Sequence, residues 1–364
     1  MAHEARESYS GLVLAKLRKE MALKDGVVFN NDYEGDPKAG VVKIPVRDTE
    51  VTAGNYNKAT GIAPGTGTTQ YVSLPITEDV AINEIIDGYD AEVVPDGIVA
   101  ERLDSGAYAL QSALDSRGAS CLLSQGTAIG IGSQTKDTIY DALVDQRKAH
   151  IKANIPNDGK RFLLATPDGY ALLLKSPMFT KASDLGDAVQ QTGAIGRIAG
   201  YNVFEMNDDT ANLAFILGHP RFATRVHAFS VPPKVVSLDG DSQYIGASAV
   251  KGRMCFGHKV LRAAAVRAVY MPSVLTVACA AATGASDSGK TVATVTGSTG
   301  TLKYRVNPSV RAAYGDDGTA AAYTSLTSGT TKITAAAGAV IEVVELDSDS
   351  KVKAVGYGVS VPMA

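Results

Sequence analysis

Residues Gly284–Thr291 read GASDSGKT and match G-x-x-x-x-G-K-[ST], the pattern of a loop that binds nucleotide phosphates. Such a loop needs a strand before it and a helix after it, because loop amides and the helix N-terminus must face the phosphates. The segment that follows, residues 291–306, is rich in Val, Thr and Gly and favours a strand. No later strand ends in an acidic residue suited to magnesium. We therefore expect a solvated β-turn and reject a nucleotide site.

The histidines, the carboxylates and the remaining glycine motif show no spacing typical of a catalytic, metal-binding or cofactor-binding site. The histidines have no HxxxH or HExxH spacing, and no pair of carboxylates can be assigned to one cleft. Asp347 and Asp349 are spaced loosely like calcium ligands but lack the full loop, so we expect a solvated turn. Gly193, Gly196 and Gly200 indicate tight turns rather than a dinucleotide loop. We predict no catalytic, cofactor-binding or metal-binding residue, no cofactor and no enzyme. The histidines are His3, His150, His219, His227 and His258.

Composition predicts a globular chain of about two domains. The 364 residues are 45% hydrophobic, 20% charged and 6% aromatic, without Trp. No apolar run is long enough to span a bilayer, and the first ten residues do not form a secretory signal. With a formal net charge of −3, the chain as a whole does not attract nucleic acid electrostatically, although a single basic face could do so. Cys121, Cys255 and Cys279 are expected to be buried thiols in a reducing cytoplasm.

The N-terminal half contains three patterns that must position whatever function exists. Glu4–Leu23 predicts an amphipathic helix stopped by Gly26, docked either on its own domain or on a neighbouring subunit. Gly40–Ile76 contains two strand-like runs around a linker rich in Gly and Thr. Pro45 and Pro75 predict that both strands are edges of a thin ribbon, which needs a surface to lie on. The alternative is a disordered surface loop.

The middle of the chain predicts helices and a strand–helix–strand unit. Apolar residues at three- and four-residue steps predict a helix over Gly97–Leu123, about 40 Å long, and a second over Ile139–Ile151. Within Arg161–Asp209 we expect strand Phe162–Ala165, a cap at Thr166, helix Asp168–Lys175, a short apolar run 195–198, a turn at Gly200 and strand 201–206.

The last third predicts strands. We expect strands at 213–217 and 224–231, a surface turn at Pro232 and Pro233, and a returning strand within 259–270. After Pro272 the composition shifts to Ala, Thr, Ser, Gly and Val, and seven short strand candidates recur at about ten-residue spacing. This pattern favours an all-β sandwich of immunoglobulin-like size, although no Cys…Trp…Cys pattern accompanies it.

The segments ATPDGYALLLKSPMFT and TGAIGRIAGYNVFEMND resemble, in order and spacing, the axial domain of tailed-phage major capsid proteins of the HK97 fold. The resemblance covers residues 1–272 and implies an α+β, HK97-like capsid fold, with an immunoglobulin-like all-β sandwich appended. The expected parts are an N-terminal arm (1–39), an E-loop hairpin (40–76), a peripheral domain with a spine helix (77–135), an axial domain (136–258), a return to the peripheral domain (259–272) and the β sandwich (273–364).

The function that this resemblance implies is assembly of an icosahedral virion shell from pentamers and hexamers of the chain around double-stranded DNA. Expected partners are further copies, a separate scaffolding protein, a portal protein, a decoration or cement protein and DNA bound non-specifically on the inner face; no membrane partner is expected. The scaffold is expected to be separate because the chain starts at Met1 almost directly with its arm helix. Assembly would occur in the host bacterial cytoplasm. A nanocompartment shell of the encapsulin type and a virion adhesin or tail protein are the alternatives.

Interface residues then matter most: the arm, the hairpin and the axial loops of Asp184–Ile198. Some relatives cross-link the hairpin through Lys and Asn, but no such pair can be assigned here. The basic residues near the N-terminus face either solvent or DNA. Residues 273–364 are expected outside the shell, either as a decoration or, as we favour, a clamp on neighbours, since their charges alternate in sign. The basic residues are Arg6, Lys16, Arg18, Lys19 and Lys24.

Overall fold

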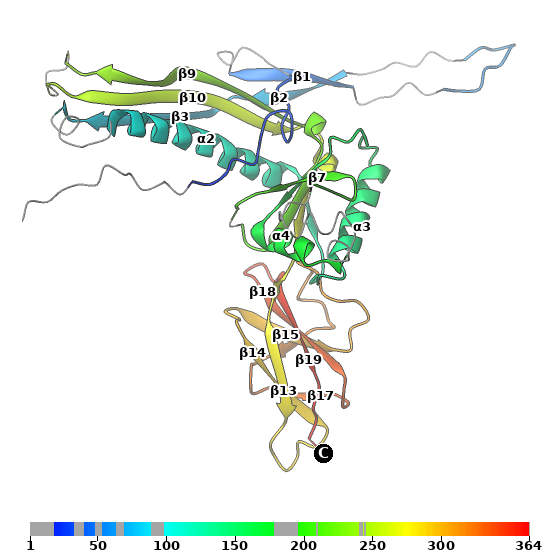
Figure 1. Ribbon diagram of the computed structural model, residues 1–364. Helices are drawn as coiled ribbons and strands as arrows, with labels where there is room; N and C mark the ends of the chain where they lie inside the picture. Colours follow the sequence, from blue (N-terminus) through cyan, green and yellow to red (C-terminus); the bar gives the residue numbers. More distant parts are fainter. Residues whose placement is uncertain are drawn as a thin grey trace, which may run out of the picture. The chain divides into compact units, whose positions relative to one another are not determined.

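The computed structural model describes residues 18–32, 40–47, 53–62, 69–88, 98–177, 196–208, 210–239, 243 and 245–363. They belong to two compact units (Figure 1), Met1–Gly126 with His219–Val266, and Thr127–Gly218 with Arg267–Ala364. These units do not test the predicted domain boundaries at 136, 258 and 272, which stay predictions. Residues 223–260 pair with a strand of the first unit, whereas Arg267–Tyr270 joins a sheet of the second.

The first unit contains two antiparallel sheets and one long helix. A two-stranded ribbon is followed by a three-stranded sheet in the order β3-β10-β9, and α2 runs along one face of that sheet (Figure 1). The expected long helix and the expected ribbon are therefore both present. The elements are β1 (Val41–Arg47), β2 (Thr69–Pro75), β3 (Glu78–Ile86), α2 (Ile98–Gln125), η2 (Pro220–Phe222), β9 (Ala223–Ser237), β10 (Ser248–Val260) and η3 (Ala263–Ala265).

The contact between α2 and the sheet is apolar at its centre and charged at its ends. Leu110 and Leu114 of α2 pack against Met254 and Phe256 of β10, with Val80 and Ile82 of β3 beside them. A Cβ at Gly106 would lie 2.5 Å from Ile82 Cδ1, so the small residue permits this close approach. The ion pairs Arg102–Glu84 and Arg117–Glu78 join helix and strand on either side of the apolar centre.

Residues 232 and 233 form part of β9 and not the expected surface turn. β9 is an edge strand, so a proline there need not remove a ladder hydrogen bond. The register of β9 on β10 shifts at this point, since Lys251 pairs with Lys234 and Arg253 pairs with Val231. Pro232 and Pro233 are therefore accommodated in a bulge, and the strand continues to Ser237.

The N-terminal segment corrects a second expectation. Residues 4–17 of the expected helix lie outside the described residues, and its remaining residues, 18–23, are not helical. They follow α2 instead: the Tyr108 hydroxyl accepts from Lys19 N at 2.8 Å, and Asp115 Oδ1 accepts from Leu23 N at 3.0 Å. Val28 and Phe29 are fully buried. Long-range partners thus replace the local hydrogen bonds of a helix.

The second unit begins with a mixed six-stranded sheet in the order β4-β11-β8-β5-β7-β6. Two helices, α3 and α4, pack with it around a core that includes Leu143, Leu163, Tyr201 and Phe215. The expected strand–helix–strand unit is present within one or two residues of its predicted bounds. The elements are β4 (Thr127–Gly130), α3 (Ile139–Lys152), β5 (Phe162–Ala165), α4 (Pro167–Leu174), β6 (Arg197–Ile198), β7 (Tyr201–Glu205), β8 (Leu213–Gly218) and β11 (Arg267–Tyr270).

Thr166 occupies the N-cap position of α4 but does not cap it through its side chain. Its hydroxyl donates to the carbonyls of Leu213 at 2.8 Å and Ala214 at 3.1 Å, so it fastens α4 to β8 instead. Pro167 follows at the first helical position, as expected. Gly200 has a φ of +86° in the turn between β6 and β7, which favours glycine. Residues 178–195, which include most of the expected axial loops, lie outside the described residues.

Residues 273–363 form two further sheets, ordered β12-β19-β18-β15-β16 and β13-β14-β17. Each of the seven expected strands is found, and β12 adds a short eighth. A buried cluster that includes Ala293, Ile333, Ile341 and Val343 draws on both sheets. The elements are β12 (Ser273–Val274), β13 (Thr276–Ala281), β14 (Lys290–Thr296), β15 (Thr301–Val306), β16 (Thr324–Leu326), β17 (Lys332–Thr334), β18 (Val340–Leu346) and β19 (Val352–Val359).

Candidate functional site

The outer face of the ribbon β1–β2 is mixed: an exposed Lys43–Ser73 pair lies between two apolar pairs. Its inner face carries Ile44 and Leu74, which are buried, whereas Tyr71 on the outer face is 66% exposed. Tyr71 lies opposite Pro45, and Val41 lies opposite Pro75, in the antiparallel register. We call these four residues the outer ribbon face. Exposed aromatic and apolar groups on a narrow ribbon are typical of a surface that becomes covered by another molecule.

The base of the ribbon is fixed to its own unit, which supplies a surface of the kind that the ribbon was expected to need. Ile44 and Leu74 form a buried cluster with Val226 of β9. A Cβ at Gly257 of β10 would lie 2.3 Å from the Pro75 carbonyl oxygen, so backbone approaches backbone there. The ribbon therefore has a packed base and an uncovered outer face.

Residues 53–62, in the linker between the two ribbon strands, form an ordered turn. Gly61 N donates to the Asn57 carbonyl at 2.8 Å, and Ala59 N donates to the Asn57 side chain at 2.9 Å. Tyr56 and Ile62 on this turn are 73% and 53% exposed. The linker thus adds two uncovered apolar side chains to those of the outer ribbon face.

The phosphate-loop match lies in a β-hairpin turn between β13 and β14, as the sequence predicts. A strand begins at Lys290, so no helix N-terminus is available to face phosphates. Lys290 Nζ lies 3.4 Å from Asp287 Oδ1, and Lys332 Nζ lies 2.7 Å from Asp287 Oδ2. These lysines lower the pKa of Asp287, the Lys332 hydrogen bond having the largest effect. Lys290 thus contributes to an ion-pair cluster within the chain.

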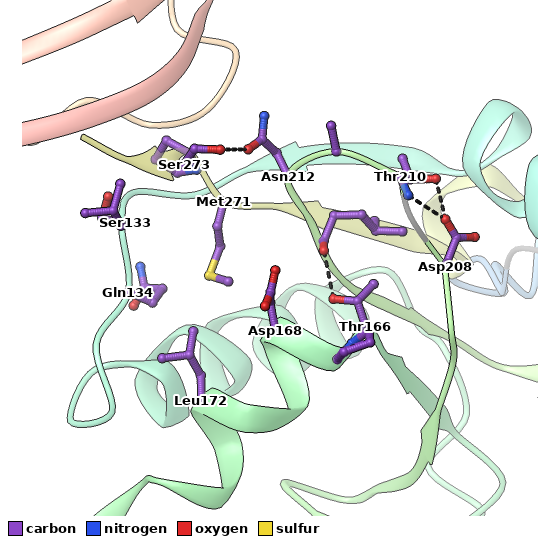
Figure 2. A pocket seen from close by; sticks show the side chains of 15 residues that line it. Ser133, Gln134, Thr166, Asp168, Leu172, Asp208, Thr210, Asn212, Met271 and Ser273 are labelled. Carbon is purple, nitrogen blue, oxygen red and sulfur yellow. Dashed lines mark hydrogen bonds between the residues drawn. The ribbon is translucent and has the colours of Figure 1, made fainter. Parts of the chain in front are cut away.

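An open cleft of about 660 Å³ lies at the N-terminal end of α4 (Figure 2). Asp168 lines it from α4, and Asp208 and Thr210 line it from the connection between β7 and β8. Asp208 accepts hydrogen bonds from the Thr210 backbone and hydroxyl, so it is engaged locally. Among the described residues that line the cleft, none is a histidine, cysteine or lysine. We assign it no catalytic chemistry.

The remaining reactive groups are also engaged or inert. Within the described ranges, no group of three or more His, Cys, Asp and Glu residues could hold a metal ion. Cys121, Cys255 and Cys279 form no disulfide with one another, and burial raises the pKa of Cys121 to about 11, which keeps its thiol protonated. Asp347 Oδ1 accepts from the backbone of Asp349 and Lys351 in a turn, as expected. Among the described helices, none is both long and apolar enough to cross a membrane.

Similarity to solved structures decides the fold. The chain is similar to a structure from Mycobacterium phage Che8, with TM-score 0.62 and 23% identity over 73% of this chain and 96% of that one. The capsid of Cyanophage P-SCSP1u gives TM-score 0.60 and 14% identity over 73% and 92%. The mature capsid of bacteriophage PhiM1 gives 0.56 and 11% over 73% and 92%. The fold is the HK97-like fold of phage capsid proteins. No family model and no curated protein sequence matches the chain.

Within the HK97-like fold, the long helix α2 fits the expected spine helix, and the ribbon occupies the expected place of the hairpin in the chain order. The capsid-like share of the chain is about three quarters. The predicted immunoglobulin-like character of residues 273–364 stays a prediction. The exposed apolar residues of the outer ribbon face were not predicted from the sequence. The period-two pattern around Pro45 and Pro75 could have indicated it, because Tyr71 and Leu74 fall on opposite faces.

Proposed function

We propose that this chain is the major capsid protein of a tailed phage. Copies assemble into pentamers and hexamers of an icosahedral shell that encloses double-stranded DNA. The protein is structural, not enzymatic, and its location is the virion capsid. The observation that carries the proposal is the similarity to phage capsid folds over more than nine tenths of those chains.

The ribbon supports this proposal because its chemistry suits a contact between copies. Its base packs on Val226, while Tyr71, Pro45, Val41 and Tyr56 leave apolar surface uncovered. A neighbouring copy that covers these side chains gains about 25 cal/mol for each Å² of apolar area removed from water. Such a gain repeated in every subunit favours a closed shell. The ribbon is accordingly the element that we propose to contact the neighbour.

The proposed partners are other copies, a separate scaffolding protein, a portal protein and packaged DNA contacted non-specifically on the inner face. A decoration or cement protein is a further proposed partner. Assembly is proposed in the host bacterial cytoplasm. Residues 273–364 are proposed as an appended β sandwich, immunoglobulin-like in size, on the outside of the shell. They make up about a quarter of the chain, and the similar capsid structures cover 73% of it.

A nanocompartment shell is the alternative function, because an HK97-like fold can enclose protein cargo instead of DNA. The chain is also similar to the capsid of an empty GTA particle, with TM-score 0.52 and 14% identity over 73% of this chain and 95% of that one. The similar structures named above are all phage or GTA particles, so the phage capsid is favoured. An adhesin or tail protein is less favoured, because it does not account for the first 272 residues.

Electron microscopy of the expressed chain tests the proposal. We expect closed shells when the chain is expressed with its scaffolding protein, and nuclease-protected DNA in particles recovered from infected cells. Particles that hold a protein cargo and no DNA would favour the nanocompartment. Dispersed subunits under all these conditions would contradict both shell functions.

Two variants at position 71 test whether the ribbon takes part in shell assembly. Tyr71→Ser removes the exposed ring and is expected to reduce shell yield at least tenfold, whereas Tyr71→Phe keeps the ring and is expected to assemble normally. Both free subunits should melt as the parent does, because the Tyr71 side chain is mostly exposed. Equal shell yields from both variants would show that the outer ribbon face is not a contact.

A further inference from the structure

The end of strand β4 carries a surface shaped for another segment of the same unit. Residues 130–132 continue β4, and the Ile131 backbone N–H donates to the Tyr270 carbonyl of β11 at 3.0 Å. β4 is an outer strand of the six-stranded sheet, so its continuation has an unpaired side. Residues 312–316, from the long connection between β15 and β16, bond to this continuation.

The two segments meet through backbone and rings. Gly132 and Ala313 form an antiparallel bridge, and Tyr314 N donates to the Ile131 carbonyl at 3.2 Å. The rings of Tyr270 and Tyr314 stack with centroids 5.3 Å apart and an interplanar angle of 17°. Burial raises the pKa of Tyr270, and the nearby Tyr314 raises it further. The contact therefore combines β pairing with a stacked aromatic pair.

Glycine at position 130 permits this approach. A Cβ at Gly130 would lie 1.8 Å from the Tyr314 carbonyl oxygen and 2.9 Å from its carbonyl carbon. No side chain fits there without moving the loop. At Gly132 the same construction gives 3.6 Å to the Ala312 oxygen, which is ordinary contact. The close approach of the loop therefore requires glycine at position 130 but not at position 132.

The loop is held in shape by its own domain before it meets β4. Ala312 N donates to the buried Glu342 carboxylate at 2.9 Å, and Arg305 donates to the Val310 carbonyl at 2.6 Å. Gly315 N donates to the Val352 carbonyl at 2.8 Å. Ala312 also belongs to a small core with Val344, Leu346, Val352 and Val355. A loop fixed by a buried charge and a core can act as a preformed docking element.

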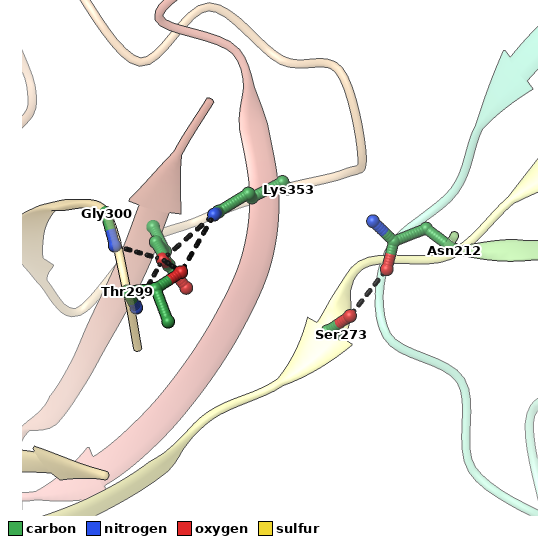
Figure 3. A network of polar contacts seen from close by, with 6 residues as sticks. Asn212, Ser273, Thr299, Gly300 and Lys353 are labelled. Carbon is green, nitrogen blue, oxygen red and sulfur yellow. Dashed lines mark hydrogen bonds and ion pairs between the residues drawn. The ribbon is translucent and has the colours of Figure 1, made fainter. Parts of the chain in front are cut away.

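Further hydrogen bonds hold the connection that leads from β11 into residues 273–363. Met271 N donates to the Asn212 carbonyl at 2.8 Å, and Ser273 Oγ lies 2.5 Å from Asn212 Oδ1 (Figure 3). A separate network within the C-terminal sheet joins Lys353 of β19 to Glu345, which also accepts from Thr299 N and Gly300 N (Figure 3). The connection is therefore hydrogen-bonded rather than a bare linker.

We propose that residues 130–132 are a docking surface for loop 312–316, which fastens the C-terminal β domain to the six-stranded sheet at a second point. The linker near Ser273 is the first point. Two points restrict rotation about a single connection, so the domain is presented in one orientation by every copy. The proposal concerns contacts within one chain and stands whether or not the chain forms shells.

Hydrogen exchange of the full-length chain tests the proposal at Tyr314 N–H, the amide that donates across the contact. Gly130→Ala is expected to raise its exchange rate at least tenfold, because the added methyl displaces the loop. Gly132→Ala is the matched control and is expected to leave the rate within twofold of the parent. Amides of β5, such as Leu163, should keep parental rates in both variants, which separates loss of docking from loss of the sheet.

Tyr314→Ala is a second variant that leaves β4 unaltered and removes the stacked ring. It is expected to raise the exchange rate at amide 314 and the protease sensitivity of residues 307–323. Equal exchange in Gly130→Ala and Gly132→Ala, together with a parental rate in Tyr314→Ala, would overturn the proposal. If Gly130→Ala does not fold, the result of Tyr314→Ala decides alone: a parental rate rejects the docking contact.

Discussion

Acid should weaken the first unit through His258, whose ring is enclosed by aromatic neighbours. The Phe29 and Phe256 rings lie 5.2 and 5.5 Å from it, both edge-on. Burial lowers the pKa of His258 from 6.5 to about 4, and the charges of Arg225 and His227 lower it further, while Asp25 opposes them. A protonated ring would place a cation beside Arg225 in an apolar setting.

The sign and size of the effect follow from proton linkage. Above pH 6.5 the imidazole is neutral in both states and contributes full stability. As the pH falls from 6.5 toward 4, the unfolded chain binds a proton that the folded chain does not, so folding stability is lost. Each tenfold difference in proton affinity is worth about 1.4 kcal/mol, so the loss approaches about 3 kcal/mol near pH 4.

Urea unfolding of the free subunit at pH values between 7 and 4 measures this loss. His258→Gln cannot titrate, so its unfolding free energy should fall less steeply over that interval than the parent's, by up to about 3 kcal/mol. The comparison removes the contribution of carboxylates, which both proteins share. Parallel curves for parent and variant between pH 6.5 and 4 would refute the assignment to His258.

Three other variants have expected outcomes. Lys290→Ala should leave shell assembly unchanged, lower stability by less than about 1 kcal/mol, and show no difference in ATP binding by calorimetry, because Lys332 still pairs with Asp287. Gly257→Ala should destabilise by about 1–3 kcal/mol and accelerate hydrogen exchange in β1 and β2, because its methyl meets the Pro75 carbonyl. Glu342→Ala should destabilise by about 3–5 kcal/mol in thermal unfolding, because Arg305 and Ala312 N lose their buried partner.

Controls with the same chemistry make these outcomes specific. Gly196→Ala adds a methyl where no atom lies within 4 Å, so exchange in the ribbon should not change. Asp349→Ala removes an exposed carboxylate and should cost far less than Glu342→Ala. ATP binding by the parent that is lost in Lys290→Ala would restore the phosphate site. A ribbon that exchanges equally fast in the parent and Gly257→Ala would show that its base is not packed.

Elements whose hydrogen bonds and apolar period are local could be predicted from the sequence. The three- and four-residue steps of Leu103, Leu110 and Leu114 gave α2 within about two residues, and the runs after Pro272 gave every longer strand of the C-terminal sheets. The rejection of a phosphate site also followed from local pattern, because the Val- and Thr-rich run after Lys290 favoured a strand.

Elements fixed by distant partners could not be predicted. Residues 18–24 have a helical apolar period, but Leu23 N is paired with Asp115, 92 positions away, and no local pattern contains that information. Pro232 and Pro233 were predicted to form a turn. They lie instead in a bulge of an edge strand, and a strand's position at the edge depends on the order of strands in the sheet, which the local sequence does not contain. The docking of loop 312–316 depends on Gly130, whose small size is explained only by the Tyr314 carbonyl.

The packing of α2 on its three-stranded sheet affects how stiff the first unit is. A helix of 28 residues is about 42 Å long at about 1.5 Å per residue, and the 13 residues of β10 extend about 43 Å, so the two are nearly matched. The helix and the sheet are packed together through a shared apolar cluster and are therefore expected to bend less than either would alone. The cluster includes Leu110, Leu114, Met254 and Phe256. A tilt of about one degree at one end moves the other end by roughly 0.7 Å over that length. In the proposed shell, small changes of angle between copies would therefore displace side chains at the far end of this unit by a fraction of an ångström.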